Sequence, residues 1–320
     1  MRWFLIGLCL AAIPNSGRAY TAYVTNERDN TLSVVDLDQM KTVKTVQVGQ
    51  RPRGITMTKD GSQILVCASD DDTIQIIDTA TLRIVGELPS GPDPETFALH
   101  VSGNPLYVSN EDDNMITVID VPSRKVLAQI PTGVEPEGMA VSPDGQTIVN
   151  TSETTNMAHF LDYQTRKMVA AVLVDARPRV AMFKHDGSEV WVSSELGGTV
   201  SVIDPVKHVV THKISFEIQG LRAEAIQPVG IRFTQDDSMA FVALGPANRV
   251  AVIDTKSYKV KKLLLVGQRV WQMAFTPDQK YLLTTNGLSN DISVIDVADL
   301  GVVKSIQVGR LPWGVVVSPK

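Results

Sequence analysis

Charged and aromatic side chains flank a proline that recurs along the chain, and their types limit the chemistry open to this protein. The proline is found at Pro52, Pro94, Pro136, Pro178, Pro228 and Pro312, with Val270 once in its place. The flanking residues that form our candidate binding site are Arg51, Arg53, Asp93, Glu95, Glu135, Glu137, Arg177, Arg179, Arg269, Trp271 and Trp313. Carboxylate, guanidinium and indole groups of this kind can bind a polar ligand or a partner protein, or can neutralise one another.

Three interpretations of these residues stay open. The two acidic pairs lie between doubly basic pairs, so the charges can form compensating ion pairs around a wet channel. Alternatively they bind a partner or a small polar ligand, with Trp271 and Trp313 as apolar anchors. A cation held by carboxylates is the weakest interpretation, because the arginines compete for the same groups, and we expect no metal site. Nearby turns add Glu27, Glu111, Glu153 and Glu195.

No set of residues in the sequence suggests nucleophilic catalysis. The five histidines fall on different parts of the repeated unit described below, and none is next to the recurring proline. Cys67 is the single cysteine beyond the N-terminal apolar segment, and its place in an apolar run predicts a buried core residue. We therefore expect no catalytic residues, no bound cofactor and no enzyme activity of the chain alone.

The proline belongs to a unit that the chain repeats seven times. An aspartate closes the same apolar run in each copy, at Asp36, Asp78, Asp120, Asp162, Asp204, Asp254 and Asp296, with steps of 42 residues and one step of 50. Each copy contains four short apolar runs separated by turn residues, and the repeated aspartate is expected to bond the next turn. A fixed period of about 40 residues with four strands is typical of a β-propeller blade. The sequence thus predicts an all-β, seven-bladed propeller with four-stranded antiparallel blades.

The ends of the repeats predict how the propeller closes. The first copy starts with the second strand of a blade, at Ala22, and the chain finishes with an innermost strand that starts at Trp313. We expect the N-terminal strands to pair with this C-terminal strand, which leaves no free sheet edge. The residues on either side of each recurring proline then surround one end of the central channel, here called the channel mouth. The extra residues of the fifth copy, 216–225, are expected to overhang it.

The N-terminus carries a predicted secretory signal. Arg2 precedes an apolar run that is too short to span a bilayer, and small residues lead to a predicted cut after Ala19. The domains are thus a signal at 1–19 and the propeller at 20–320. Removing Arg2 and Arg18 with the signal takes the net charge from −5 to −7, which argues against nucleic acid as a partner. We expect a periplasmic protein without a membrane span.

Two resemblances support this interpretation. The runs AYVTN…VVD and LYVSN…VID with PEGMAVSPDG resemble the YVTN-type β-propeller repeat over nearly the whole chain after the signal. The less regular runs, KISFEIQGLRAEAIQPVGI, AFVALGPANRVAVID, LLLVGQRVWQMAFTPD, TTNGLSNDISVID and VGRLPWGVVV, resemble the β-propeller proteins associated with pyrroloquinoline quinone (PQQ)-dependent catabolism.

The resemblance implies a periplasmic accessory protein that works beside a quinoprotein alcohol dehydrogenase or a transport component. It does not imply that this chain binds the quinone. The first hypothesis is therefore a non-catalytic binding or scaffold protein. The second is a propeller subunit of a quinone-cofactor dehydrogenase, since propellers of this type are also similar to the heavy subunits of amine dehydrogenases. The third and least favoured is a hydrolase such as a lactonase.

Overall fold

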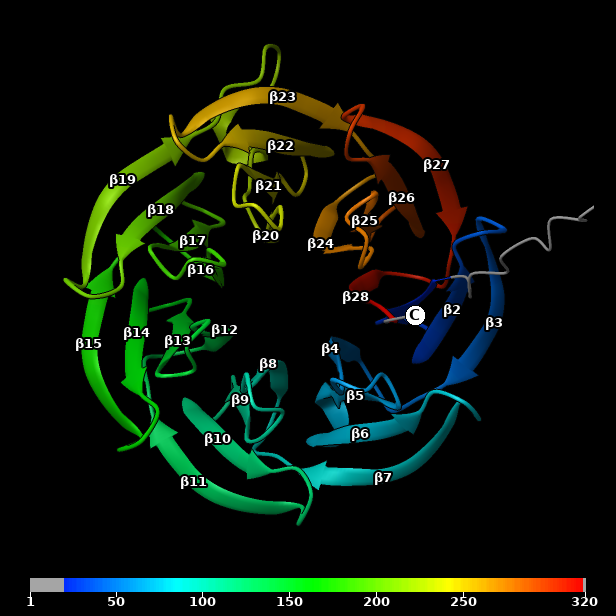
Figure 1. Ribbon diagram of the computed structural model, residues 1–320, viewed down its shortest axis with the longest axis vertical. Helices are drawn as coiled ribbons and strands as arrows, with labels where there is room; N and C mark the ends of the chain where they lie inside the picture. Colours follow the sequence, from blue (N-terminus) through cyan, green and yellow to red (C-terminus); the bar gives the residue numbers. More distant parts are fainter. Residues whose placement is uncertain (1–19, 319–320) are drawn as a thin grey trace, which may run out of the picture.

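The computed structural model describes residues 20–318, so the predicted signal lies outside the described residues. The strands of the described part form seven four-stranded sheets around a central channel (Figure 1). All neighbouring strands within a sheet are antiparallel. The predicted seven-bladed propeller is confirmed.

The first four blades each run from an innermost to an outermost strand. Blade 1 consists of β28 (Pro312–Val317), β1 (Thr21–Asn26), β2 (Thr31–Asp36) and β3 (Lys41–Gln47). Blade 2 consists of β4 (Pro52–Met57), β5 (Gln63–Ala68), β6 (Thr73–Asp78) and β7 (Arg83–Pro89). Blade 3 consists of β8 (Pro94–Leu99), β9 (Leu106–Asn110), β10 (Met115–Asp120) and β11 (Lys125–Pro131). Blade 4 consists of β12 (Pro136–Val141), β13 (Thr147–Ser152), β14 (Met157–Asp162) and β15 (Lys167–Leu173).

The last three blades have the same order. Blade 5 consists of β16 (Pro178–Phe183), β17 (Val190–Ser194), β18 (Thr199–Asp204) and β19 (Val209–Ser215). Blade 6 consists of β20 (Ile231–Phe233), β21 (Met239–Ala243), β22 (Arg249–Asp254) and β23 (Lys259–Leu265). Blade 7 consists of β24 (Val270–Phe275), β25 (Tyr281–Asn286), β26 (Asp291–Asp296) and β27 (Gly301–Gln307). Two 3₁₀ turns, η1 (Ser69–Asp71) and η2 (Ala223–Ala225), complete the described elements.

The ring closes in blade 1, as the sequence predicts. β28 pairs with β1 in the register Ala22↔Val317, Tyr23↔Val316 and Val24↔Val315. Beyond the strands, Ser318 N donates to Thr21 O at 2.8 Å, and Thr21 N donates to Ser318 Oγ at 3.1 Å. The two ends of the chain are therefore held in one sheet (Figure 1).

Packing between blades explains why the middle strands are apolar on both faces. Tyr23 and Leu32 of blade 1 share a core cluster with Ile64 and Val66 of blade 2, and similar clusters lie around the ring. Cys67 in β5 is fully buried and unpaired, which confirms the predicted core position. Outer strands such as β3 are mostly exposed, because they have a neighbouring strand on one side only.

The recurring aspartate has the predicted structural role. Asp36 Oδ1 accepts from the backbone N–H groups of Asp38 and Gln39 at 2.9 and 2.8 Å. The equivalent aspartates of the other six blades also accept from a backbone N–H of the following turn. These bonds close the turn between the third and fourth strands of each blade.

The extra residues of the fifth repeat do not overhang the channel mouth, so that prediction was wrong. Phe216 and Ile226 anchor the segment in the hydrophobic cluster between blades 5 and 6. The segment lies at the outside of the ring, beyond β23 (Figure 1). Burial of these apolar ends fixes the insert at the periphery.

None of the helices within residues 20–318 has the length and apolar character to cross a bilayer.

Candidate binding site at the channel mouth

In most repeats a left-handed backbone places the residue before the innermost strand at the channel mouth. The φ angles of Arg51, Asp93, Glu135, Arg177 and Arg269 lie between 48° and 58°. In each case the backbone N–H of this residue donates to the side-chain oxygen of an Asn or Asp that lies 21 residues earlier in the chain. Non-glycine residues adopt this backbone region at a cost, so the repeated hydrogen bond is what holds them there.

A second repeated bond fixes the residue after the proline. Thr25 Oγ1 donates to the carbonyl oxygen of Arg53 at 2.9 Å, and Thr151 Oγ1 donates to that of Arg179 at 2.8 Å. Thr285 does the same to Trp313 at 2.7 Å. Each bond runs from the second strand of one blade to the innermost strand of the next. The side chains on both sides of the proline are therefore positioned by hydrogen bonds to the backbone.

The first group of charges joins blades 2 and 3. Arg53 Nη1 lies 2.7 Å from Glu95 Oε1, and Arg51 Nη1 lies 3.3 Å from the same oxygen. Arg51 also pairs with Asp93, and its Nε lies 2.7 Å from Asp70 Oδ1. The Glu95 side chain is fully buried. Two guanidinium groups thus share one buried carboxylate.

The second group joins blades 4, 5 and 7. Arg179, 4% exposed, pairs with Glu137 at 2.9 Å and also with Glu153 and Glu195. Arg177 lies 2.9 Å from Glu153 and 3.1 Å from Glu195. Arg269 Nη2 reaches Glu195 Oε1 at 2.7 Å, although the two residues are 74 positions apart. The structure therefore brings most of the predicted residues into two ion-pair groups, together with Glu153 and Glu195 from the turns that the sequence places nearby.

Burial dominates the protonation of the carboxylates in these groups. It raises the pKa of Glu95 to about 8 and the pKa values of Glu137 and Glu153 to about 7, although Arg53 or Arg179 pulls each of them down. Burial also raises the pKa of Asp93 and of Glu111. Neighbouring carboxylates add to the rise, since Glu111 and Asp93 both repel a charge on Glu95.

Two sets of carboxylates lie close enough to share a cation. They are Asp93, Glu95 and Glu111, and then Glu111, Glu135 and Glu153, with one ligand oxygen from each residue within 4.8 Å of the others in its set. Carboxylate oxygens are suitable ligands for a divalent cation. The absence of a metal site stays a prediction.

The two tryptophans differ in what they offer to a partner. Trp313 is 3% exposed, and the Arg53 guanidinium lies over its ring at 5.0 Å from the centroid. Trp271 is half-buried beneath Arg269, whose guanidinium lies 4.2 Å from its ring centroid. Trp313 is therefore packed inside the ring, and Trp271 is the aromatic residue that a partner could reach.

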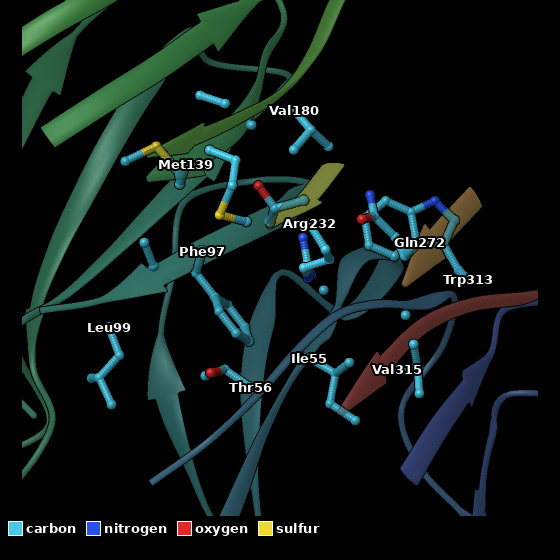
Figure 2. Close-up of a pocket in the computed structure, with 17 residues that line it drawn as sticks. Ile55, Thr56, Phe97, Leu99, Met139, Val180, Arg232, Gln272, Trp313 and Val315 are labelled. Carbon is cyan, nitrogen blue, oxygen red and sulfur yellow. The ribbon is translucent and has the colours of Figure 1, made fainter. Parts of the chain in front are cut away.

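The central channel contains one residue that the sequence interpretation missed. A cavity of about 210 Å³ lies between the innermost strands, and Arg232 of β20 is part of its lining (Figure 2). Arg232 lies opposite Phe241 of the second strand. The residues at the equivalent position in the other six innermost strands are Thr56, Ala98, Ala140, Met182, Ala274 and Val316. A comparison of the seven repeats at this position would have found the single charge.

Comparisons with known proteins agree on the fold. The family model of the choice-of-anchor I domain matches residues 121–296, which is more than half of the 320-residue chain. No curated protein is detectably similar in sequence.

Solved structures with this fold come from several bacteria. A functionally unknown protein from Desulfotomaculum acetoxidans is 15% identical over 93% of this chain and 98% of its own, with a TM-score of 0.79. A putative 6-phosphogluconolactonase from Bacteroides uniformis is 17% identical over 94% and 100%, with a TM-score of 0.77. Hydrazine synthase from Kuenenia stuttgartiensis is 20% identical over 81% and 87%, with a TM-score of 0.73. At these identities the likeness extends to the fold alone.

Proposed function

The chain belongs to the choice-of-anchor I domain family, and on that premise we propose that it is a non-catalytic binding or scaffold protein of the periplasm. Its partner binds at the channel mouth and carries basic groups on the matching surface. The partner is a quinoprotein dehydrogenase or a transport component of PQQ-dependent alcohol catabolism, and it contributes the chemistry that this chain lacks.

The observation that carries this proposal is the excess of carboxyl groups over guanidinium groups at the channel mouth. Five arginines, Arg51, Arg53, Arg177, Arg179 and Arg269, face eight carboxylates, Asp70, Asp93, Glu95, Glu111, Glu135, Glu137, Glu153 and Glu195. The raised pKa values of Glu95, Glu137 and Glu153 are the electrostatic consequence of burial together with this crowding. A partner with Lys or Arg side chains would relieve the repulsion on binding.

The resemblance in sequence supports the metabolic context of the proposal. The irregular segments of the last three repeats are the ones that are similar to the propeller proteins associated with PQQ-dependent catabolism. Those segments include Arg269 and Trp271 of the channel mouth. The part of the chain that carries the resemblance therefore also supplies part of the proposed docking surface.

Affinity capture with the mature protein tests this function. The bait is incubated with a periplasmic extract of cells grown on an alcohol, and the captured proteins are identified. The double variant Glu111→Gln/Glu135→Gln removes two half-buried carboxylates and is expected to lose the partner. Glu87→Gln, on the exposed face of β7, is the matched control and should retain it. Capture should weaken between about 0.1 M and about 1 M salt, because charges at a wet surface are screened.

The same experiment distinguishes the other hypotheses. A captured small subunit with a covalently bound quinone would favour a propeller subunit of a quinone-cofactor dehydrogenase. Lactone hydrolysis by the purified chain alone would favour a hydrolase. Equal capture by the Glu111→Gln/Glu135→Gln variant and by the wild type would exclude the channel mouth as the docking surface.

A further inference from the structure

Arg232 is the one charged side chain that lines the central cavity, within the described residues. The cavity is otherwise lined by apolar residues and a few neutral polar ones, among them Phe97, Met139 and Gln272 (Figure 2). Met182 is also part of the lining. Figure 2 places Arg232 between Phe97 on one side and Gln272 with Trp313 on the other. A guanidinium group therefore extends into a space that the other blades keep free of charge.

No carboxylate compensates this charge. The Arg232 side chain has one hydrogen bond in the described part of the chain, from Nη1 to the carbonyl oxygen of Ile231 at 2.7 Å. Every arginine of the channel mouth, in contrast, has at least one acidic partner. Burial without a neighbouring anion lowers the pKa of Arg232 to about 10, so the side chain still carries its charge at neutral pH.

Most N–H donors of this guanidinium group have no acceptor within the described residues, and the group lines the cavity, so these donors are available to a ligand that enters it. An alanine, threonine, methionine or valine serves the fold at the same register in the other six blades. The fold therefore does not require an arginine here. The residue fits a role in which an acceptor enters the cavity from outside.

We propose that Arg232 binds a small organic monocarboxylate inside the central channel. The planar guanidinium group can donate two parallel hydrogen bonds to a carboxylate. The apolar part of the ligand lies against Phe97, Met139 and Met182. This site is distinct from the charged groups of the proposed docking surface, because Arg232 is the fourth residue after Pro228 and of the mouth residues only Trp313 also lines the cavity.

The size and charge of the site narrow the ligand class. A cavity of about 210 Å³ has room for a small organic molecule. It is smaller than the cavities of about 300–1,000 Å³ that hold drug-sized molecules. One positive charge balances one negative charge, so a monoanion fits better than a dianion such as phosphate. Short aliphatic and simple aromatic carboxylates meet both requirements.

Calorimetry and thermal unfolding of the mature protein test the site with acetate, butyrate and benzoate as probes. We expect affinity to rise from acetate to benzoate as more apolar surface is buried. Benzyl alcohol, which is similar in shape to benzoate but neutral, and inorganic phosphate should bind at least tenfold more weakly. Arg232→Gln should lower benzoate affinity at least tenfold. Arg232→Lys should retain part of the benzoate affinity, because the positive charge remains but the two parallel N–H donors of the guanidinium group are lost.

The outcomes separate this site from the channel mouth. Arg232→Gln removes an uncompensated charge, so it is expected to fold and to capture the periplasmic partner as the wild type does. Glu111→Gln/Glu135→Gln should bind benzoate normally. The proposal is overturned if none of the three carboxylates binds, if phosphate binds as well as benzoate, or if Arg232→Gln leaves benzoate affinity unchanged.

Discussion

Arg179 Nη2 lies 2.9 Å from Glu137 Oε1, and both side chains are 4% exposed. The two residues come from neighbouring innermost strands, β16 and β12. Arg179 also pairs with Glu153 and Glu195, so one buried guanidinium holds three carboxylates together. The stability of the channel mouth should depend on this residue more than on any exposed charge.

Replacement of Arg179 tests that dependence. Arg179→Met would leave Glu137, Glu153 and Glu195 buried without this cation, and we expect a loss of about 3–5 kcal/mol in the free energy of unfolding. Arg177→Met is the matched control, because Arg177 pairs with two of the same carboxylates but is 44% exposed. Its loss should be about 1 kcal/mol or less. Urea unfolding measures both, and equal losses would contradict the central role of Arg179.

The raised pKa values of the buried glutamates predict how stability changes with pH. Glu95 titrates near 8 and Glu137 and Glu153 near 7 in the folded protein, against about 4.3 for an unfolded chain. At pH values between the unfolded and the folded pKa, the folded state binds more protons than the unfolded state. The free energy of unfolding therefore falls as pH rises from about 5 to about 8. Chemical unfolding at several pH values measures the slope.

A neutral variant identifies the source of that slope. Glu95→Gln imitates the protonated side chain at all pH values, so its stability should vary less with pH above neutrality than that of the wild type. Glu87→Gln on the outer strand should leave the slope unchanged. A wild-type stability that increases steadily from pH 5 to pH 8 would show that these glutamates are ionised in the folded state.

Trp313 should contribute to folding rather than to partner binding. It is 3% exposed, so Trp313→Ala leaves a cavity and is expected to lower the free energy of unfolding by about 3–5 kcal/mol. Leu288→Ala in a nearby turn is the control, since Leu288 is 63% exposed and should contribute about 0.5 kcal/mol or less. If the Trp313→Ala protein were stable but no longer bound the partner, Trp313 would be an apolar anchor for the partner, as the sequence predicts.

Closure of the ring predicts that the last strand supports the whole domain. Deletion of residues 311–320 removes β28 and exposes one edge of β1, so we expect loss of the cooperative unfolding transition. A milder test is Gly314→Ala, whose new Cβ would lie 2.7 Å from the carbonyl oxygen of Arg53. Gly301→Ala in β27 meets no atom closer than 4.0 Å and is the control. Retention of wild-type melting by the truncated protein would contradict closure in blade 1.

The sequence predicted the blades well because the information is local and repeated. The aspartate of each repeat bonds its own turn, and the proline marks the start of each innermost strand, so the same pattern indicates strand order in every copy. The insert at 216–225 was placed wrongly because loop length does not reveal which apolar side chains will be buried. Phe216 and Ile226 fix it at the outside of the ring.

The sequence by itself determined the number of blades, the closure by the C-terminal strand and most of the residues that gather at the channel mouth. Only the tertiary structure decided how those residues are used. The pairing of Arg269 with Glu195, the burial of Trp313 and the uncompensated charge of Arg232 all depend on distances across the channel. A repeat gives the position of a residue within its blade, but contacts across the channel depend on how seven blades curve into a ring.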